Sequence, residues 1–196
     1  MTTTPTTPTT PTRRRPRRAC RRIGLAATAT AFALLPLAPP AGAAPSTHLP
    51  LTQILREAVN RAHHEHPDAQ FYGAQAVLPL PTTHPQDVRA WWIHFRAKDP
   101  AKSFEYRYAT NGQYQGTQPW KTPIGIRAVS GFTLTESQAH DLAVRQGHTG
   151  AFKALYLSEP VVEQPHPTYY FCIPSENKTV AVDTVTHSVT TPLGCR

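Results

Sequence analysis

Long apolar runs are missing from this chain of 196 residues, and so are the common short motifs of catalysis. The longest apolar run, residues 23–38, has roughly 16 residues and is interrupted by Pro36, whereas a helix that spans a bilayer needs about 20. No Gly-x-Ser-x-Gly turn, His-Glu-x-x-His helix or glycine-rich phosphate loop occurs. These absences argue against a mature membrane span and leave no nucleophile in a recognisable turn.

The first 43 residues have the three-part layout of a secretory signal. A Thr/Pro-rich start leads to the basic block RRRPRRACRR, the apolar run follows, and Ala41-Gly42-Ala43 then fits an A-x-A cleavage site. We therefore expect residues 1–43 to be a signal peptide and the mature protein to be secreted. Arg21-Arg22 would suit twin-arginine export, and the Sec route is the alternative.

The strong positive charge of the chain belongs to that signal. The full chain has 20 Lys and Arg, 12 Asp and Glu, and a net charge of +8. Seven arginines lie in the signal, which contains no acid, so removing them leaves 13 basic residues and a net charge of about +1. Without a basic excess, binding to nucleic acid through its phosphates is not expected. We also expect no membrane contact after signal removal, and a monomer.

Two of the three cysteines, Cys172 and Cys195, lie in the mature chain. In an oxidising exterior an even pair is expected to form a bridge, and two cysteines allow one connectivity. Closing a loop of about 23 residues stabilises a fold by roughly 3 kcal/mol in the chain-entropy model. We expect this disulfide to hold the C-terminus in place.

Helical periodicity at the start of the mature chain predicts a helix over residues 50–65. Pro50 suits the first helical turn, and Pro67 prevents continuation past His66. One apolar stripe at i, i+3, i+4, i+7, i+8 and i+11 contains Leu51, Ile54, Leu55, Ala58, Val59 and Ala62.

Three strand-like runs follow this helix, at residues 69–79, 88–97 and 103–110. Asn111-Gly112 ends the third run with a strong turn signal. Residues 115–131 contain Pro and Gly without a clear period, and we expect them to be a linker to the next unit.

The second part of the chain repeats the helix-then-strands pattern. Thr135 and Gln138 have the spacing of a capping box, and Gly147 is a natural residue just past a helix end. Strand-like runs follow at residues 151–159, 168–174, 178–184 and 187–191.

The two parts match each other in order: a helix, then three or four antiparallel strands. An internal duplication of about 75 residues explains this order economically. We therefore predict an α+β fold of two tandem helix-plus-antiparallel-sheet units, residues 44–124 and 125–196. Because neither unit alone would bury much apolar surface, the two are expected to share a core.

The strand-turn-strand VAVDTVTHSV resembles that of PepSY-like domains, whose units commonly close on V-x-V-D-x-x-T-G-x-V. Val180, Val182, Asp183, Thr186 and Val189 match this pattern, while His187 stands where the family usually has Gly. The alanine-containing helix and the HPDA entry to the first strand add to the resemblance. It implies a cystatin-like sheet wrapped on a helix, in an exported actinobacterial protein with regulatory or inhibitory roles toward peptidases. It carries no catalytic residue to transfer.

The histidine-rich stretch RAHHEHPDA raises the question of a metal site. His63 and His66 have the i, i+3 spacing that suits two helical ligands, but a site needs three or four converging ligands. His84, His94, His140 or His148 would have to supply the remainder from other elements. A solvated helix end is the alternative, in which imidazolium groups complement the helix dipole. We expect no metal and no other cofactor, with His63 and His66 as the weak candidates.

Aromatic residues concentrate in the predicted strands. Adjacent pairs such as Trp91-Trp92 and Tyr169-Tyr170 must place one ring on each sheet face. One face packs on a helix, and the other either binds a partner or is covered by the second sheet. We name Trp91, Trp92, Tyr106 and Tyr169 as candidate binding residues.

These observations support three functional hypotheses. The first is a secreted, non-catalytic binding module directed at a protein partner, such as a peptidase or an envelope protein. The second is a metal-dependent hydrolase built around His63 and His66. The third is a structural exported protein. No catalytic residue is assigned.

Overall fold

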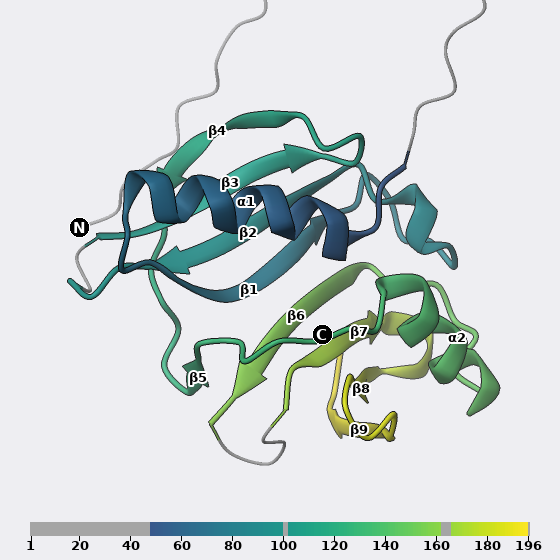
Figure 1. The fold of residues 1–196 in the computed structure, drawn as a ribbon. Coiled ribbons are helices and arrows are strands. Elements are labelled where there is room, and N and C mark those ends of the chain that lie inside the picture. The colour runs from purple at the N-terminus through teal and green to yellow at the C-terminus, as the bar shows by residue number, and fades with distance from the viewer. Residues whose placement is uncertain (1–47, 100–101, 162–165, 196) are drawn as a thin grey trace, which may run out of the picture. The chain divides into compact units, whose positions relative to one another are not determined.

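A computed structural model describes residues 48–99, 102–161 and 166–195 of the chain. The expected signal peptide, residues 1–43, lies outside the described residues. Within these residues the fold is α+β, with two α-helices and a large antiparallel sheet. Figure 1 shows the first helix lying across one part of the sheet and the second helix near the opposite end.

The first part of the fold is a helix followed by four strands. Helix α1 (Leu51–Glu65) begins after Pro50 and ends before His66, as its stripe and prolines predict. The strands follow in the order β1 (Gln70–Val77), β2 (Ala90–Arg96), β3 (Ser103–Ala109) and β4 (Tyr114–Pro119). A 3-10 turn, η1 (Pro85–Asp87), lies between β1 and β2.

The second part of the fold repeats this order after a short strand. The short strand is β5 (Ile126–Arg127), and α2 (Glu136–Arg145) follows it with the predicted capping box. The remaining elements are β6 (Ala154–Pro160), β7 (Thr168–Ile173), η3 (Pro174–Glu176), β8 (Lys178–Asp183) and β9 (Val189–Leu193).

All of these strands belong to one antiparallel sheet. Its order is β4-β3-β2-β1-β6-β7-β8-β9, and β5 pairs with the end of β6. The two parts meet where β1 pairs with β6, through Gly73–Ser158, Ala74–Leu157 and Gln75–Tyr156. The two sets of strands therefore join edge to edge, and neither set covers the other. The alternative in which the second sheet covers the first is wrong, because the two sets of strands pair through β1 and β6 as one sheet.

Both helices pack on the same core. Buried side chains of α1 (Leu51, Ile54) and of α2 (Ala139, Ala143) belong to one cluster with the inward side chains of the strands. Tyr169 of β7 packs in this cluster, and its hydroxyl donates to the Leu134 carbonyl oxygen at 3.2 Å. The expected sharing of a core is therefore present.

The segment predicted as a linker, residues 115–131, is only partly one. It contains most of β4 and all of β5. Strand β4 has the sequence YQGTQP, in which Gly and Pro have low strand propensity. Pairing with β3 along Phe104–Pro119 to Tyr108–Tyr114 makes it a strand, so tertiary contacts override the local signal.

Candidate functional site

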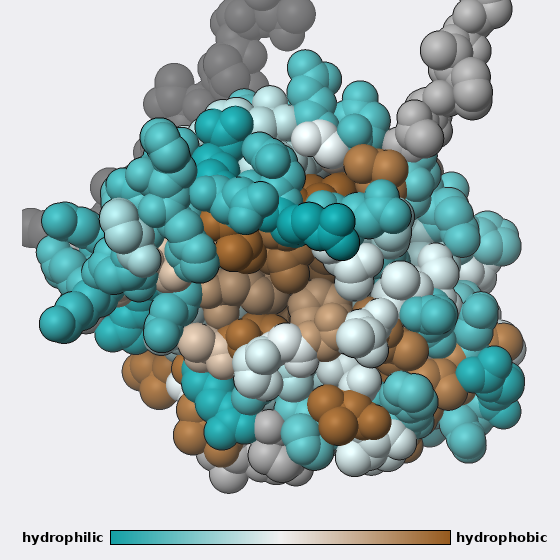
Figure 2. Space-filling view, viewed as in Figure 1, coloured by the Kyte–Doolittle hydropathy of each residue, from teal (hydrophilic) through white to brown (hydrophobic). Residues whose placement is uncertain are grey.

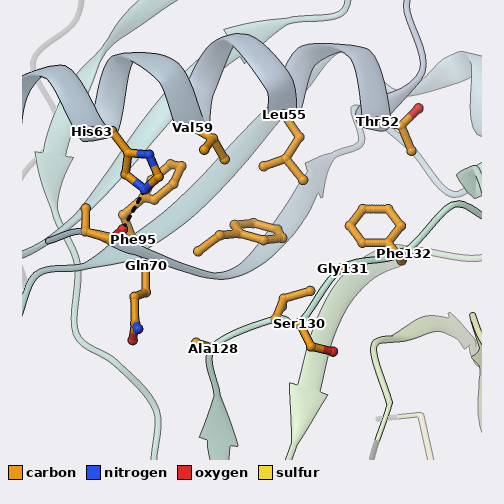
Figure 3. Close-up of a pocket in the computed structure, with 13 residues that line it drawn as sticks. Thr52, Leu55, Val59, His63, Gln70, Phe95, Ala128, Ser130, Gly131 and Phe132 are labelled. Carbon is orange, nitrogen blue, oxygen red and sulfur yellow. Dashed lines mark hydrogen bonds between the residues drawn. The ribbon is translucent and has the colours of Figure 1, made fainter. Parts of the chain in front are cut away.

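A groove of about 400 Å³ runs beside α1 on the helical side of the sheet. The space-filling view in Figure 2 shows apolar side chains exposed in a hollow below this helix. Figure 3 shows the residues around it: α1 forms one wall, the extended residues 128–132 form the other, and the first two strands form the floor. Its size lies within the range of small-molecule and peptide-side-chain pockets.

Helix α1 can form one wall of the groove because the apolar stripe of the helix is wider than the part of it that contacts the sheet. Ile54 and Ala58 are buried against the strands, whereas Leu55 and Val59 are half-buried and line the groove. A helix stripe with i+3 and i+4 members spans more than one contact line, so its flank remains available. Thr52 and His63 continue the same wall toward the two ends of the helix.

The floor of the groove is aromatic. Phe95 of β2 is fully buried, and its ring centroid lies 6.0 Å from that of Phe71 of β1. Across the groove from α1, the ring of Phe132 makes an edge contact with Tyr169, at 6.0 Å between centroids. These contacts fix the aromatic side chains in position, so the apolar surface is formed before any ligand binds.

A buried carboxylate holds the opposite wall in place. Glu159 of β6 is 2 % exposed and accepts three hydrogen bonds: from Arg127 Nε at 2.7 Å, and from the backbone nitrogen and hydroxyl of Ser130 at 2.7 and 2.9 Å. The backbone nitrogen of Val129 donates to the Phe71 carbonyl oxygen at 2.8 Å. The wall is therefore fixed to β6 and to β1 at once, although it has no regular secondary structure.

Beyond these anchors, the backbone of the wall is unpaired. Within the described part of the chain, no hydrogen bond joins the backbone of Gly131, Phe132 or Thr133 to another residue. No Asp, Glu, Lys or Arg is among the described residues that line the groove. At one end His63 Nε2 lies 3.0 Å from the Ala69 carbonyl oxygen (Figure 3), which orients the imidazole. The groove thus offers mainly apolar side chains and backbone polar groups, together with a few polar side chains such as those of Thr52, His63 and Gln70.

The candidate aromatic residues divide between the two faces of the sheet. Trp91, Tyr106 and Tyr169 are fully buried on the helical face, and their expected place at a binding surface is wrong. The reason is alternation: inward positions of β2, β3 and β7 point at the helices. Trp92, the neighbour of Trp91, lies on the other face, half-buried beneath the Arg107 guanidinium at 5.0 Å. A binding role for Trp92 stays a prediction.

His63 and His66 do not converge. The His63 imidazole faces the groove, while the His66 ring packs on Phe104 of β3 with 4.7 Å between centroids. Among residues 48–99, 102–161 and 166–195, no three His, Cys, Asp or Glu side chains lie close enough together to hold a metal ion.

The expected disulfide between Cys172 and Cys195 is present. It joins β7 to the residues after β9, with 5.2 Å between the Cα atoms. Because β9 is the edge strand and β7 is the third strand from that edge, the bridge ties the residues after β9 back to the sheet.

A second cluster of polar side chains lies on the face of the sheet away from the helices. His94 of β2 is largely buried there, stacked on Trp120 at 4.5 Å between centroids. Burial lowers the pKa of His94 to about 4, even though its Nε2 lies 3.4 Å from Glu105 Oε2. Gln118 of β4 donates to the other oxygen of Glu105. His94 is therefore a neutral, fixed ring near pH 7.

Sequence reasoning missed the groove because its two walls are not adjacent in the chain. Leu55 and Val59 carried the signal of a core stripe, and residues 128–132 carried only that of a linker. The one local signal was the pair of apolar residues Val129 and Phe132 around Ser-Gly, just before the capping box. Nothing local marks Glu159 as the anchor that shapes the wall.

Comparisons with known proteins found one similar solved structure and no matching family. No protein-family model and no curated protein matches the chain. Among solved structures, the chain is similar to the crystal structure of a "putative lipoprotein" from Clostridium difficile 630, with 14 % identity and a TM-score of 0.49. The alignment covers 73 % of this chain and 91 % of that one. In the described residues neither helix is long and apolar enough to cross a membrane.

Proposed function

We propose that this chain is an exported binding protein without catalytic activity, and that the groove beside α1 takes an extended apolar segment of a protein partner. The observation that carries the proposal is the combination of apolar walls with the backbone of Gly131 and Phe132, which lines the groove and has no hydrogen-bond partner among the described residues. Unpaired backbone groups in an extended segment can add a strand, while side-chain pockets select the residues of that strand. The chain supplies both in one place.

The length of the groove sets the length of the bound segment. Thr52 and His63 mark its ends along α1, and eleven steps of 1.5 Å give about 16 Å. An extended chain advances roughly 3.3 Å per residue, so the groove holds about five residues. Because no Asp, Glu, Lys or Arg lines it among the residues that the structure describes, a segment with small or medium apolar side chains fits, and one with charges in its centre does not.

The proposed partner class is a peptidase or another protein of the cell envelope. Two features support it: the export signal expected at residues 1–43, and the resemblance of VAVDTVTHSV to PepSY-like domains, which implies roles toward peptidases. A cystatin-like inhibitor acts by binding rather than by chemistry.

We also infer that the two parts of the fold derive from one duplicated PepSY-like unit. Each part has a helix followed by four strands, and the strand order mirrors itself about the β1–β6 ladder. At equivalent bends, Gly112 and His187 both have positive φ, of 84° and 60°. The left-handed conformation of His187 supports the view that it replaces an ancestral Gly.

A peptide-binding experiment tests the groove. The probe is the capped pentapeptide Thr-Val-Thr-Val-Thr, added to ¹⁵N-labelled mature protein. We expect saturable shifts of the Gly131, Phe132 and Thr133 amides. Val59→Asp should weaken binding about tenfold, since it places a charge on the apolar wall. Val144→Asp, on the exposed side of α2, is the matched control and should leave binding unchanged.

Two outcomes contradict the proposal. The first is the absence of saturable shifts at residues 131–133. The second is equal binding of a pentapeptide with N-methylated valines, which cannot donate to the wall. The partner class is tested separately, by capture from culture supernatant on wild type and on Val59→Asp. A peptidase or envelope protein should be retained by the first and lost by the second.

A further inference from the structure

The face of the sheet opposite the helices carries a second groove, of about 420 Å³. Alternation along β6 and β7 turns Tyr156 and Tyr170 to this face, because their neighbours Leu157 and Tyr169 are buried in the core. Both tyrosines line the groove, and Tyr156 is 39 % exposed. Leu193 of β9 also lines it and is 64 % exposed. The groove therefore offers rings and an aliphatic side chain to the solvent.

The segment that follows β4 borders this groove and carries an exposed isoleucine. Trp120, Pro123 and Ile126 line the groove. Ile124 does not line it, and at 104 % it is the most exposed large apolar side chain of the described residues. Isolated apolar residues are common on protein surfaces, but here the exposed side chain stands at the edge of an apolar groove. We call residues 121–125 the knob loop.

The knob loop is fixed at both ends. Before it, the backbone nitrogen of Trp120 donates to the Ser103 carbonyl oxygen at 3.0 Å. After it, β5 pairs with the end of β6, and the Gly125 carbonyl oxygen accepts from the Val161 nitrogen at 2.9 Å. Gly125 has φ of 89°, a left-handed value that residues with a Cβ disfavour, so a glycine suits the turn after Ile124. The isoleucine is presented before any partner binds.

The groove suits an apolar side chain. Among the described residues that line it there is no Asp, Glu, Lys or Arg. The imidazole among them, that of His94, is neutral near pH 7, because burial lowers its pKa to about 4. An isoleucine that enters the groove therefore removes no ionised side chain of the lining from water, and the desolvation cost of a buried charge does not arise.

The knob and the groove lie side by side on one chain, so this surface is complementary to itself. A two-fold axis beside the knob loop places Ile124 of each copy over the groove of the other, and the same contact forms twice. The surface comprises the fourteen residues that line the groove, the rest of the knob loop and Val161, which is 57 % exposed. This number comes close to the roughly 20 to 30 residues per side of a standard interface.

We propose that two copies of this chain form a two-fold dimer through this face, in which each Ile124 enters the groove of the other copy and packs against Tyr156 and Leu193. The size of the surface places the dimer at the weak end of specific interfaces. The groove beside α1 lies on the other face of the sheet and stays open in the dimer. The monomer expected from the sequence is then the form at low concentration.

Sedimentation velocity over a micromolar concentration series of the mature protein tests the proposal. We expect a monomer–dimer equilibrium in wild type. Ile124→Asp should weaken it at least about tenfold, since it places a charge in the apolar groove. Leu80→Asp, at a side chain 74 % exposed that lines neither groove, is the matched control and should dimerise like wild type. Unchanged binding of Thr-Val-Thr-Val-Thr to Ile124→Asp shows that this variant is folded.

A cross-link locates the contact. Ile124→Cys and Tyr156→Cys are mixed under mild oxidation, with the Cys172–Cys195 bridge intact in both. We expect a disulfide between the two chains, because the proposal brings these side chains together across the two-fold axis. Leu80→Cys in place of Ile124→Cys should give no cross-link with Tyr156→Cys.

Three outcomes overturn the proposal. The first is a monomer at every concentration of wild type, which would leave the groove to a different partner. The second is dimerisation of Ile124→Asp as tight as that of wild type, which would place the contact elsewhere on the chain. The third is growth of wild type beyond the dimer, because a head-to-tail contact between knob and groove does not close.

Discussion

The two helices of this protein start in different ways, although each leads into four antiparallel strands. Helix α2 is capped by its own sequence: the Thr135 backbone nitrogen donates to Gln138 Oε1 at 2.8 Å, and the Gln138 backbone nitrogen donates to Thr135 Oγ1 at 3.3 Å. Helix α1 follows Pro50, which offers no side-chain cap. The Leu51 backbone nitrogen donates instead to Glu136 Oε2, at 3.2 Å, from the first turn of α2. The first part of the fold therefore depends on the second for its helix start.

The ends of the two parts also differ. The second part ties its edge strand β9 to β7 by the Cys172–Cys195 bridge, whereas β4, the edge of the first part, has no such covalent link. At the bend before the edge strand, the first part has Gly112 and the second has His187. The two parts therefore have the same order of elements but are stabilised by different interactions. The disulfide, the cap of α1 and the residue at the bend can each be changed by substitution, which tests how much each contributes.

Removal of the disulfide should have the largest effect. The double variant Cys172→Ser/Cys195→Ser should lose about 3 kcal/mol of unfolding free energy, because a loop of 23 residues is no longer closed in the unfolded chain. Urea unfolding measures the loss. Hydrogen exchange should accelerate first in β9 and not in β4. Exchange that rises equally at both edges would show that the bridge does not distinguish the two parts.

Acid should destabilise the first part through His94. The pKa of this ring is about 4 in the folded protein and near 6.5 in the unfolded chain. The folded state therefore favours the neutral imidazole over the protonated one. The contribution of His94 is complete above pH 6.5 and disappears as the pH falls toward 4, which is worth up to about 3 kcal/mol. His94→Gln should remove that part of the pH dependence.

Urea unfolding of wild type and His94→Gln at pH 7 and at pH 4 checks this prediction. The quantity to compare is the change in free energy between the two pH values, since loss of the stacking on Trp120 affects the variant at both. Equal changes in both proteins would mean that His94 is not the acid-sensitive group.

The shared helix cap should respond to the side chain at position 136. Glu136 is fully buried, and desolvation raises the pKa of its carboxyl group. Glu136→Ala leaves the Leu51 nitrogen without an acceptor and should cost about 1–3 kcal/mol. Glu136→Gln keeps an acceptor without the buried charge, so it should retain most of the stability at pH 7. Thr135→Ala, which removes only the local cap of α2, should cost about 1 kcal/mol.

Amide exchange separates these cap variants. Glu136→Ala should expose the first turn of α1, and Thr135→Ala that of α2 alone. If the Leu51 amide exchanges equally fast in wild type and in Glu136→Ala, the hydrogen bond from Leu51 to Glu136 does not stabilise the start of α1.

The turn comparison gives the smallest effect. His187 has φ of 60° in a left-handed conformation that a side chain with a Cβ disfavours, so His187→Gly should stabilise the protein by about 0.5–1 kcal/mol. Asp183 still holds the bend, because its Oδ1 accepts from Val185 and Thr186 at 2.7 and 2.8 Å. Gly112→Ala, with φ of 84°, should destabilise by a similar amount. Thermal unfolding measures both, and a loss of stability in His187→Gly would contradict the strain argument.

Much of the fold could be predicted from the sequence where the signal is local. Helix α1 ends where Pro67 requires it, α2 starts at its capping box, and β1, β2 and β3 follow their alternation to within one or two residues. Strand β4 could not be predicted, because its propensity is low and β3 supplies the pairing. The groove beside α1 could not be predicted either, since Glu159 positions its wall from 29 residues away.

The sequence by itself determined the helices, most strands, the cysteine pairing and the rule that Trp91 and Trp92 face opposite sides. The helices, the strands and the alternation of the tryptophans follow from interactions between residues near one another in the chain. The cysteine pairing follows because only two cysteines lie after residue 43. Only the tertiary structure decided which of the two tryptophans is buried and that the halves share one sheet. Those outcomes depend on the β1–β6 ladder and on which face the helices cover, and both are set by contacts between residues distant in sequence.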